Sequence, residues 1–182
     1  MQFETSRLTL RLMQPTDLEQ ALLYWLDASV NQYLPFPLDR SFATQKFNQT
    51  LLPWGGEDGD KLVLAIVDKA SNGLIGEIMF KYVNKASGLA EIGYCLNVQS
   101  QGKGYAAEAV KGLMGFAFSE LGAHKLMAIV DTRNLASTKL LDKLAMRREG
   151  CLIEHDKIKG QWCDLYSYGM LAKEFNGLYQ LD

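Results

Sequence analysis

The sequence predicts a mixed α/β domain in which helices cover both faces of one sheet. Two observations lead to this class. Several segments alternate apolar and polar residues with the period of a strand, whereas others repeat apolar residues at the three-and-four spacing of a helix. In addition, an alternating segment at residues 89–98 runs directly into a helical segment and then into a short apolar strand. That order requires one right-handed crossover between parallel strands in an otherwise antiparallel sheet.

The chain of 182 residues is long enough for one domain, spanning residues 1–182, to bury a full core without metal or disulfide support. Its hydrophobic content of 48% is that of a soluble globular protein. The apolar runs are too short to span a bilayer and the first residues lack a signal-peptide pattern, so we expect a cytoplasmic protein. A net charge of −2 does not indicate a broad nucleic-acid surface. Three cysteines without a C-x-x-C motif, Cys95, Cys151 and Cys163, are expected to be free thiols.

The first part of the chain is predicted to be an antiparallel meander that carries two helices. Residues 3–13 alternate as a strand, one helix opens at Thr16, and a second spans about residues 41–52 before a proline. The connection at residues 31–37 contains two prolines and two aromatic residues. Its aromatic side chains either line a substrate cleft or, as is commoner for loops, pack against the core.

Two more strands are expected before the central one, at residues 61–67 and 74–83. Both segments are rich in apolar and β-branched residues. Asn72-Gly73 between them is a strong signal for a tight hairpin turn, because both residues tolerate a positive φ. These strands therefore form a hairpin next to strand 89–98.

The second part of the chain is predicted to complete the sheet. After the central helix, residues 125–130 form a short buried strand that runs parallel to the central strand. Either Asp131 or Asn134 opens the next helix. The inward face of that helix is expected to consist of Ala136, Leu140, Leu141 and Leu144. Residues 146–154 and 162–171 then form a closing antiparallel pair.

The junction between the central strand and its helix contains Gly102-Lys103-Gly104. A helix start leaves several backbone N–H groups without partners, and its dipole favours an anion such as a phosphate. The glycines allow close approach of a phosphate, and Lys103 adds positive charge. The glycines alone would also explain a simple turn. A third interpretation is that Gly102-x-Gly104-x-x-Ala107, with Asp131, forms a dinucleotide motif. We reject it because the rest of the chain lacks the further strand–helix repeats of that fold.

The junction also resembles a family motif. Gln99-x-x-Gly102-x-Gly104 matches the acetyl-CoA pyrophosphate motif of the GNAT N-acetyltransferase superfamily. Further matches in the same order resemble its Rim-like branch, which contains the ribosomal-protein N-acetyltransferases. These matches are residues 5–11, Glu91-Ile-Gly-Tyr94, Asn134-x-x-Ser137, Glu149-Gly150 and Trp162-x-Asp164. The resemblance covers nearly the whole chain and implies the GNAT fold, a mostly antiparallel sheet of about seven strands that is splayed near the middle.

The resemblance implies that acetyl-CoA is the acetyl donor. The spacing of the residues suggests no metal site. We expect the pyrophosphate on the backbone amides of residues 101–106 and the thioester carbonyl near the amides of residues 96–98. Asn134 is expected to contact the pantetheine arm, although a helix cap alone would explain this residue. The expected cofactor-binding residues are Leu96, Asn97, Val98, Gln101, Gly102, Lys103, Gly104, Tyr105, Ala106 and Asn134.

Two residues are the main candidates for the chemistry. Ser137, one helical turn after Asn134, would hydrogen-bond or protonate the departing thiolate, or else serve as a small residue against the cofactor. Glu91 would deprotonate the amine, although a strand glutamate in a salt bridge is the more common situation. Glu77 on the neighbouring strand is a second candidate base. Many members of the superfamily place a tyrosine acid where this chain has Leu141, so a tyrosine at that position is excluded.

The predicted function is transfer of an acetyl group from acetyl-CoA to a primary amine by direct attack. By resemblance, the acceptor is a protein N-terminus such as that of a ribosomal protein. Two alternatives stay open: acetylation of a small amine or polyamine, and a regulatory module that binds acyl-CoA without turnover. No direct nucleic-acid or membrane partner is expected, and the protein would be a monomer or a homodimer.

Overall fold

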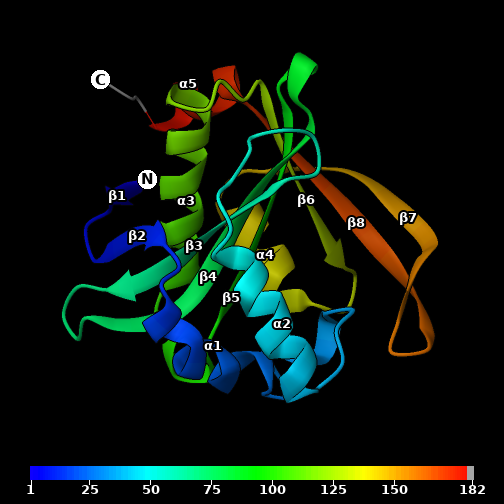
Figure 1. Cartoon of the computed structure of the whole chain (residues 1–182). Coiled ribbons are helices and arrows are strands. Elements are labelled where there is room, and N and C mark those ends of the chain that lie inside the picture. The colour runs from blue at the N-terminus through cyan, green and yellow to red at the C-terminus, as the bar shows by residue number, and fades with distance from the viewer. Residues whose placement is uncertain (180–182) are drawn as a thin grey trace.

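The computed structural model describes residues 1–179, which form a sheet of eight strands in the order β1-β2-β3-β4-β5-β6-β8-β7 (Figure 1). The strands are β1 (Gln2–Glu4), β2 (Leu8–Leu12), β3 (Lys61–Asp68), β4 (Gly73–Asn84), β5 (Leu89–Leu96), β6 (Lys125–Asp131), β7 (Arg147–Ile158) and β8 (Gln161–Leu171). The α-helices are α1 (Leu18–Trp25), α2 (Arg40–Thr50), α3 (Tyr105–Ser119), α4 (Leu135–Lys143) and α5 (Ala172–Tyr179). Short 3-10 turns are η1 (Pro15–Asp17), η2 (Asn31–Tyr33), η3 (Lys85–Ser87) and η4 (Val98–Ser100). The predicted mixed α/β class is confirmed.

The sheet has more strands than expected because residues 3–13 do not form a single strand. The chain turns after β1, where the Thr5 N–H bonds to the Leu8 carbonyl at 2.9 Å, and β1 folds back antiparallel on β2. Helix α3 holds this turn. Glu108 Oε1 accepts hydrogen bonds from the Thr5 hydroxyl at 2.6 Å and from the Arg7 N–H at 2.7 Å. The alternation of residues 3–13 does not reveal this turn, because the Glu108 carboxylate that holds it lies 103 residues from Thr5 in the sequence.

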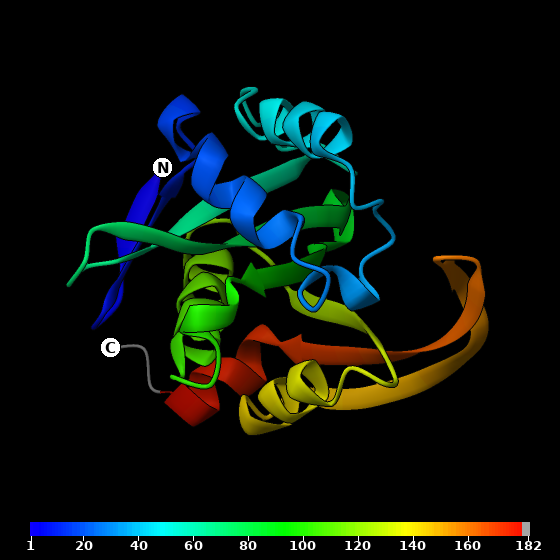
Figure 2. The ribbon, with the colours of Figure 1, turned by 90° about the horizontal axis from the view of Figure 1, so that it is seen from below.

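Helices cover both faces of the sheet, as predicted. Figure 2 shows α1 and α2 on one face and α3, α4 and α5 on the other. On the α3 face, Val110, Leu113 and Met114 belong to the larger core cluster with the strand residues. On the opposite face, Leu22 and Phe47 belong to a second cluster. The sheet is therefore buried on both sides near its centre.

β5 and β6 form the one parallel pair of the described sheet. They pair at only three positions, the last of which joins Glu91 to Met127. Beyond that point β5 stays paired with β4 as far as Leu96, and β6 stays paired with β8 as far as Asp131. The two central strands therefore diverge, and the splay implied by the GNAT resemblance is present.

Backbone hydrogen bonds hold this divergence at both ends. At the closed end the Gly88 carbonyl accepts the His124 N–H at 2.8 Å, which draws the start of β6 against β5. At the open end, the Asn97 N–H bonds to the Ile75 carbonyl of β4 at 2.9 Å. The Thr132 N–H bonds to the Asp164 carbonyl of β8 at 3.0 Å. Each central strand is thus fixed to its outer neighbour where the gap is widest.

Helix α4 and the β7–β8 hairpin differ from their predictions in detail. In α4, Leu141 and Leu144 are buried and Leu140 is half-buried, but Ala136 is exposed. The inward orientation expected for Ala136 is wrong because its side of the helix borders an open cavity. The hairpin is longer than expected, and its tip around Lys159 arches toward the α1–α2 side of the sheet (Figure 2).

The approach of β4 to β5 gives a test of the fold. A Cβ on Gly76 would lie 2.2 Å from the Cys95 carbonyl oxygen and 2.9 Å from Leu96 Cα. We predict that Gly76→Ala lowers the free energy of unfolding, measured in urea, by about 2 kcal/mol or more, as over-packing does. Gly177→Ala in α5 is the control, since its Cβ meets open space and should stabilise the helix by up to about 1 kcal/mol. Wild-type stability of Gly76→Ala would contradict this close approach.

Candidate active site

A cavity of about 620 Å³ lies between the diverging ends of β5 and β6. Its wall contains residues from both sides of the sheet, with Val30 and Tyr33 from the α1–α2 connection and Ala107 and Ser137 from α3 and α4. The volume falls in the range typical of small-molecule and cofactor sites. The cavity therefore connects the two faces of the sheet through the gap between its central strands.

The loop before α3 presents a run of unbonded backbone donors at one end of this cavity. Gly102 and Gly104 have φ angles of 72° and 82°, a left-handed region that favours glycine. Within the helix start, the Glu108 N–H bonds back to the Gly104 carbonyl at 3.1 Å. The N–H groups of residues 102–107 have no hydrogen-bond partner elsewhere in residues 1–179. These donors and the positive end of the α3 dipole suit a phosphate or pyrophosphate.

Arg7, in the turn just before β2, holds this loop in place. Its Nη1 donates to the Lys103 carbonyl at 3.1 Å, its Nε lies 2.6 Å from Glu108 Oε2, and its guanidinium lies 4.5 Å from the centre of the Tyr105 ring. Burial would raise the pKa of Glu108, but hydrogen bonds from Thr5 and Arg7 outweigh burial and hold this pKa below its usual value. The same carboxylate therefore secures the β1–β2 turn and the glycine loop.

Two of the expected backbone donors are already engaged. The Gln101 N–H bonds to the Val98 carbonyl at 3.2 Å, so the free donors begin at residue 102 rather than 101. The Asn97 N–H is bonded to Ile75, so it has no free donor for a thioester carbonyl. Gln101 acts through its side chain instead, which donates to the Leu96 carbonyl at 3.1 Å. That carbonyl faces away from β4, and the Leu96 N–H points the same way, into the gap.

Tyr94 and Ser137 meet across the gap. The Tyr94 hydroxyl and Ser137 Oγ are 2.7 Å apart. Asn134 caps α4, because its side-chain oxygen accepts the Ser137 N–H at 3.1 Å, and it also borders the cavity. Burial raises the pKa of Tyr94 to about 12, although its bond to Ser137 opposes this shift, so Tyr94 is protonated at neutral pH. A tyrosine hydroxyl thus reaches the α4 surface from β5, while Leu141 lines the wall as an apolar residue.

The structure does not bring Glu91 to the cavity. Its carboxylate lies 2.8 Å from Lys81 Nζ, in the pair that β4 and β5 make directly across from one another. Strand alternation correctly places Glu91 and Tyr94 on opposite faces of β5. However, Glu91 is still paired with Met127 of β6, so it lies before the point where the two strands diverge. The salt-bridge interpretation of Glu91 therefore describes its position, and the sequence offers no signal for Lys81 as its partner.

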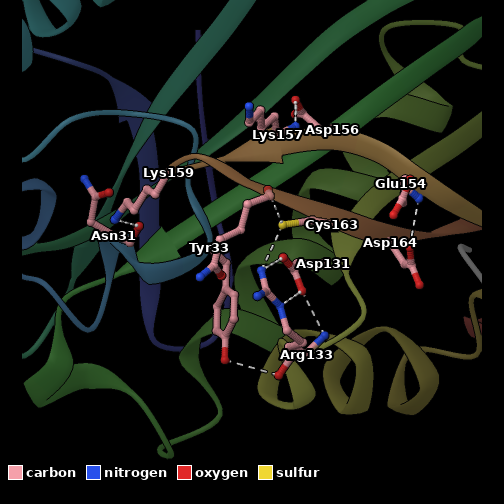
Figure 3. Close-up of polar contacts among 11 residues, drawn as sticks. Asn31, Tyr33, Asp131, Arg133, Glu154, Asp156, Lys157, Lys159, Cys163 and Asp164 are labelled. Atoms are coloured by element: carbon pink, nitrogen blue, oxygen red, sulfur yellow. Dashed lines mark hydrogen bonds and ion pairs between the residues drawn. The ribbon is translucent and has the colours of Figure 1, made fainter.

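Figure 3 shows polar contacts around Tyr33 and Asp131, two residues that line the cavity. The Tyr33 hydroxyl donates to the Arg133 carbonyl at 3.2 Å, and Lys159 at the hairpin tip donates to the Asn31 carbonyl at 2.7 Å. The Arg133 guanidinium also contacts Cys163 Sγ at 2.9 Å. Three segments far apart in the sequence are tied together here, and we call this part of the cavity, around Tyr33 and Asp131, the Tyr33 side. Of the two interpretations of the connection at residues 31–37, lining a cavity describes Tyr33.

Asp131 is the one carboxylate among the described residues that line the cavity. Its two oxygens accept hydrogen bonds from Arg133 at 2.9 and 2.6 Å, and Arg133 lowers the pKa of Asp131. The other charged residues of the wall, Lys139 and Lys143, come from α4. The wall therefore offers no uncompensated negative charge in the part of the chain that the structure describes.

A family model for the acetyltransferase (GNAT) domain matches residues 7–147. The chain belongs to the GNAT acetyltransferase family. The family predicted from the glycine loop and the further motifs along the chain is thereby confirmed, and so is the enzyme class, N-acetyltransferase. In residues 1–179 of this acetyltransferase, no helix is long and apolar enough to cross a membrane, and no three His, Cys, Asp or Glu side chains gather as a metal site requires.

Several known proteins are similar to this GNAT acetyltransferase along most of its length. The uncharacterised N-acetyltransferase p20 of Bacillus licheniformis is 35% identical over 179 residues, which cover 95% of this chain and 97% of p20. A GNAT-family acetyltransferase from Bacillus anthracis has a crystal structure with a TM-score of 0.84 at 28% identity, covering 96% of this chain and 100% of that one.

Two structures below 25% identity share the GNAT fold and differ in acceptor. One is the ribosomal-protein-S5-alanine acetyltransferase of Vibrio fischeri, with a TM-score of 0.78 at 21% identity, covering 96% of this chain and 98% of that one. The other is the spermidine N-acetyltransferase of Vibrio cholerae in complex with CoA and spermine, with a TM-score of 0.80 at 23% identity, covering 94% and 99%. The fold therefore accommodates both predicted acceptor classes.

The glycine loop yields a test of cofactor binding. Gly104→Val places a branched side chain where a phosphate would approach the backbone, so we expect acetyl-CoA affinity to fall at least about tenfold, or about 1.4 kcal/mol. Gly160→Val is the matched control, because Gly160 has nearly the same φ, 83° against 82°, and lies at the hairpin tip. Calorimetric titration of both folded variants checks this. Unchanged affinity in Gly104→Val would contradict the phosphate assignment.

Proposed function

We propose that this acetyltransferase moves the acetyl group of acetyl-CoA directly to the amino group of a protein N-terminus. The observation that carries the proposal is the cavity through the divided sheet, which joins the unbonded amides of residues 102–107 to the Tyr33 side. A donor that enters along α3 and an acceptor that enters beside Tyr33 would meet between β5 and β6. Such positioning of two reactants is a large part of the rate enhancement in direct transfer.

Backbone groups carry most of the donor site in this proposal. The amides of residues 102–107 and the Lys103 charge would hold the pyrophosphate, and Asn134 and the open edge of β5 would border the pantetheine arm. Acetyl-CoA supplies an activated thioester when bound. The Leu96 N–H faces the gap and would donate to the thioester carbonyl oxygen, where negative charge develops during attack.

The Tyr94–Ser137 pair would serve the departing sulfur. Its two hydroxyls are 2.7 Å apart and one of them lies in a buried environment that keeps it protonated. A proton passed from this pair would neutralise the thiolate as the C–S bond breaks. A thiol has an ordinary pKa of only about 8.5, so thiolate departure is already favourable and the acid accelerates the step without being indispensable.

The charge of the cavity wall favours an N-terminal amine over a polyamine. A polyamine keeps further ammonium groups after one nitrogen reacts, and these need carboxylates nearby. The cavity carboxylate, Asp131, is already compensated by Arg133. An α-amino group has a pKa of about 7.7–8.0, compared with about 10.4 for a lysine, so a larger fraction of it is neutral and nucleophilic at pH 7.

Acceptor selection can be measured directly. The protein is incubated with acetyl-CoA and one of three acceptors: peptides with a free N-terminus, the same peptides with a blocked N-terminus and a free lysine, or spermidine. We expect free-thiol release with the unblocked peptides. Release with spermidine alone would support the polyamine alternative, and acetyl-CoA binding without release in any arm would support the regulatory module.

The role of the Tyr94–Ser137 pair gives a further prediction. Ser137→Ala and Tyr94→Phe should each lower kcat by roughly ten- to a hundredfold, with little change in the KM for acetyl-CoA. Because the two hydroxyls act as one unit, the double variant should lose little more than either single variant. Steady-state kinetics of all three variants test this. A rise in the KM for acetyl-CoA at constant kcat would assign the pair to binding and packing.

A further inference from the structure

Arg133 lies in the turn between β6 and α4 and has a fixed orientation, although 48% of its side chain is exposed. Its Nε and Nη2 donate to the two oxygens of Asp131, and Nη2 also contacts Cys163 Sγ. Only 1% of the Asp131 side chain is exposed, so these contacts anchor the guanidinium on a buried carboxylate. The two N–H groups of Nη1 have no hydrogen-bond partner among residues 1–179. A guanidinium held in this way loses little freedom when it binds an anion.

Lys159 places a second cation beside Tyr33. It is an exposed residue in the turn of the β7–β8 hairpin, and its Nζ donates to the Asn31 carbonyl at 2.7 Å. This bond uses one of the three donors of the ammonium group. Among the described residues, no carboxylate pairs with Lys159. Figure 3 shows the Tyr33 side chain between Lys159 and Arg133, so the two cations lie on either side of this ring.

The cavity comes close to both cations. Tyr33 and Asp131 line its wall, and the Arg133 carbonyl accepts the Tyr33 hydroxyl at 3.2 Å. The Arg133 guanidinium lies 5.9 Å from the centre of the Tyr33 ring. Lys159 holds Asn31, which belongs to the same 3-10 turn as Tyr33. An acceptor that reaches the gap between β5 and β6 past Tyr33 would therefore pass the two cations.

The carboxylates of this region leave some donors of both cations free. Asp131 is the carboxylate in contact with Arg133, and it occupies Nε and Nη2 but not Nη1. Asp27 lies in the connection after α1, and its side chain accepts the N–H groups of Ser29 and Val30 at 2.8 and 3.1 Å. Asp27 therefore stabilises its own turn. The free donors of the two cations are available to an anionic group of an acceptor.

We propose that Arg133 and Lys159 select acceptor chains that carry an acidic side chain at their second or third residue. This inference rests on the proposed transfer to a protein N-terminus and narrows its substrate class. An extended chain advances about 3.3–3.6 Å per residue, so these side chains would lie beside Tyr33 when the amine is between β5 and β6. A carboxylate there would accept charge-assisted hydrogen bonds from Arg133 Nη1 or Lys159 Nζ. The same cations disfavour the ammonium form of the approaching amine, which favours the neutral nucleophile.

The test compares three unblocked peptides that differ only at their second and third residues, which are both aspartate, both asparagine or both arginine. The wild-type kcat/KM should be about tenfold higher for the acidic peptide than for the neutral one, and lowest for the basic one. Added salt should weaken this preference, because exposed charges are screened. Equal values for the three peptides, or a preference for the basic one, would overturn the proposal. Binding of acetyl-CoA without acetylation of any peptide would instead refute the proposed function, on which the proposal rests.

Two variants assign the preference to these side chains. Arg133→Gln should reduce the ratio of acidic to neutral kcat/KM, and Lys159→Glu should bring it to about one or below. Lys159→Glu leaves the contact between Arg133 and Asp131 intact, so the test does not depend on the Arg133 variant folding. Lys173→Glu is the matched control, since it makes the same change of net charge on exposed α5, on the opposite face of the sheet, and should keep the wild-type ratio (Figure 2). A Lys159→Glu variant that keeps the wild-type ratio, or that slows all three peptides equally, would overturn the proposal.

Discussion

The divergence of β5 and β6 is the constraint on which the rest of the structure depends. Two parallel strands that pair at only three positions leave the edge of each unpaired along its remaining length. Such an opening in a sheet is unfavourable unless each strand keeps its other neighbour. Here the Asn97 N–H bonds toward β4 and the Thr132 N–H bonds toward β8, so each strand end is fixed on its outer side. The gap is therefore part of the folded architecture.

The same account explains why the site consists largely of backbone groups. The donors of residues 102–107 are free because the loop and the first turn of α3 leave them without acceptors. Side chains mostly support this arrangement. Arg7 and Glu108 fix the loop to the β1–β2 turn, and Asn134 fixes the start of α4 so that the Ser137 hydroxyl meets Tyr94. Loss of one support would shift reacting groups without removing any of them, which is why positioning matters as much as residue identity.

The sequence was informative where the cause is local. Gly102-Lys103-Gly104 and the Asn134 cap depend on φ angles and on the start of a helix, and both were predictable from spacing. Pairings between residues far apart in the sequence are not predictable in this way. Tyr94 and Ser137 are 43 residues apart, and Tyr33 and the Arg133 carbonyl are 100 residues apart. Alternation gave the correct face for Glu91, but the identity of the residue across from it depends on strand register, which a single sequence does not specify.

A crystal structure with CoA bound is the most direct measurement of the central claim. The account predicts the pyrophosphate on the amides of residues 102–107, the pantetheine arm between β5 and β6, and the sulfur beside the Tyr94 and Ser137 hydroxyls. β5 and β6 should pair at only the same three positions. Binding of CoA on another surface, or β5 and β6 found paired beyond Glu91 and Met127, would contradict the claim that this gap is the site of acetyl transfer.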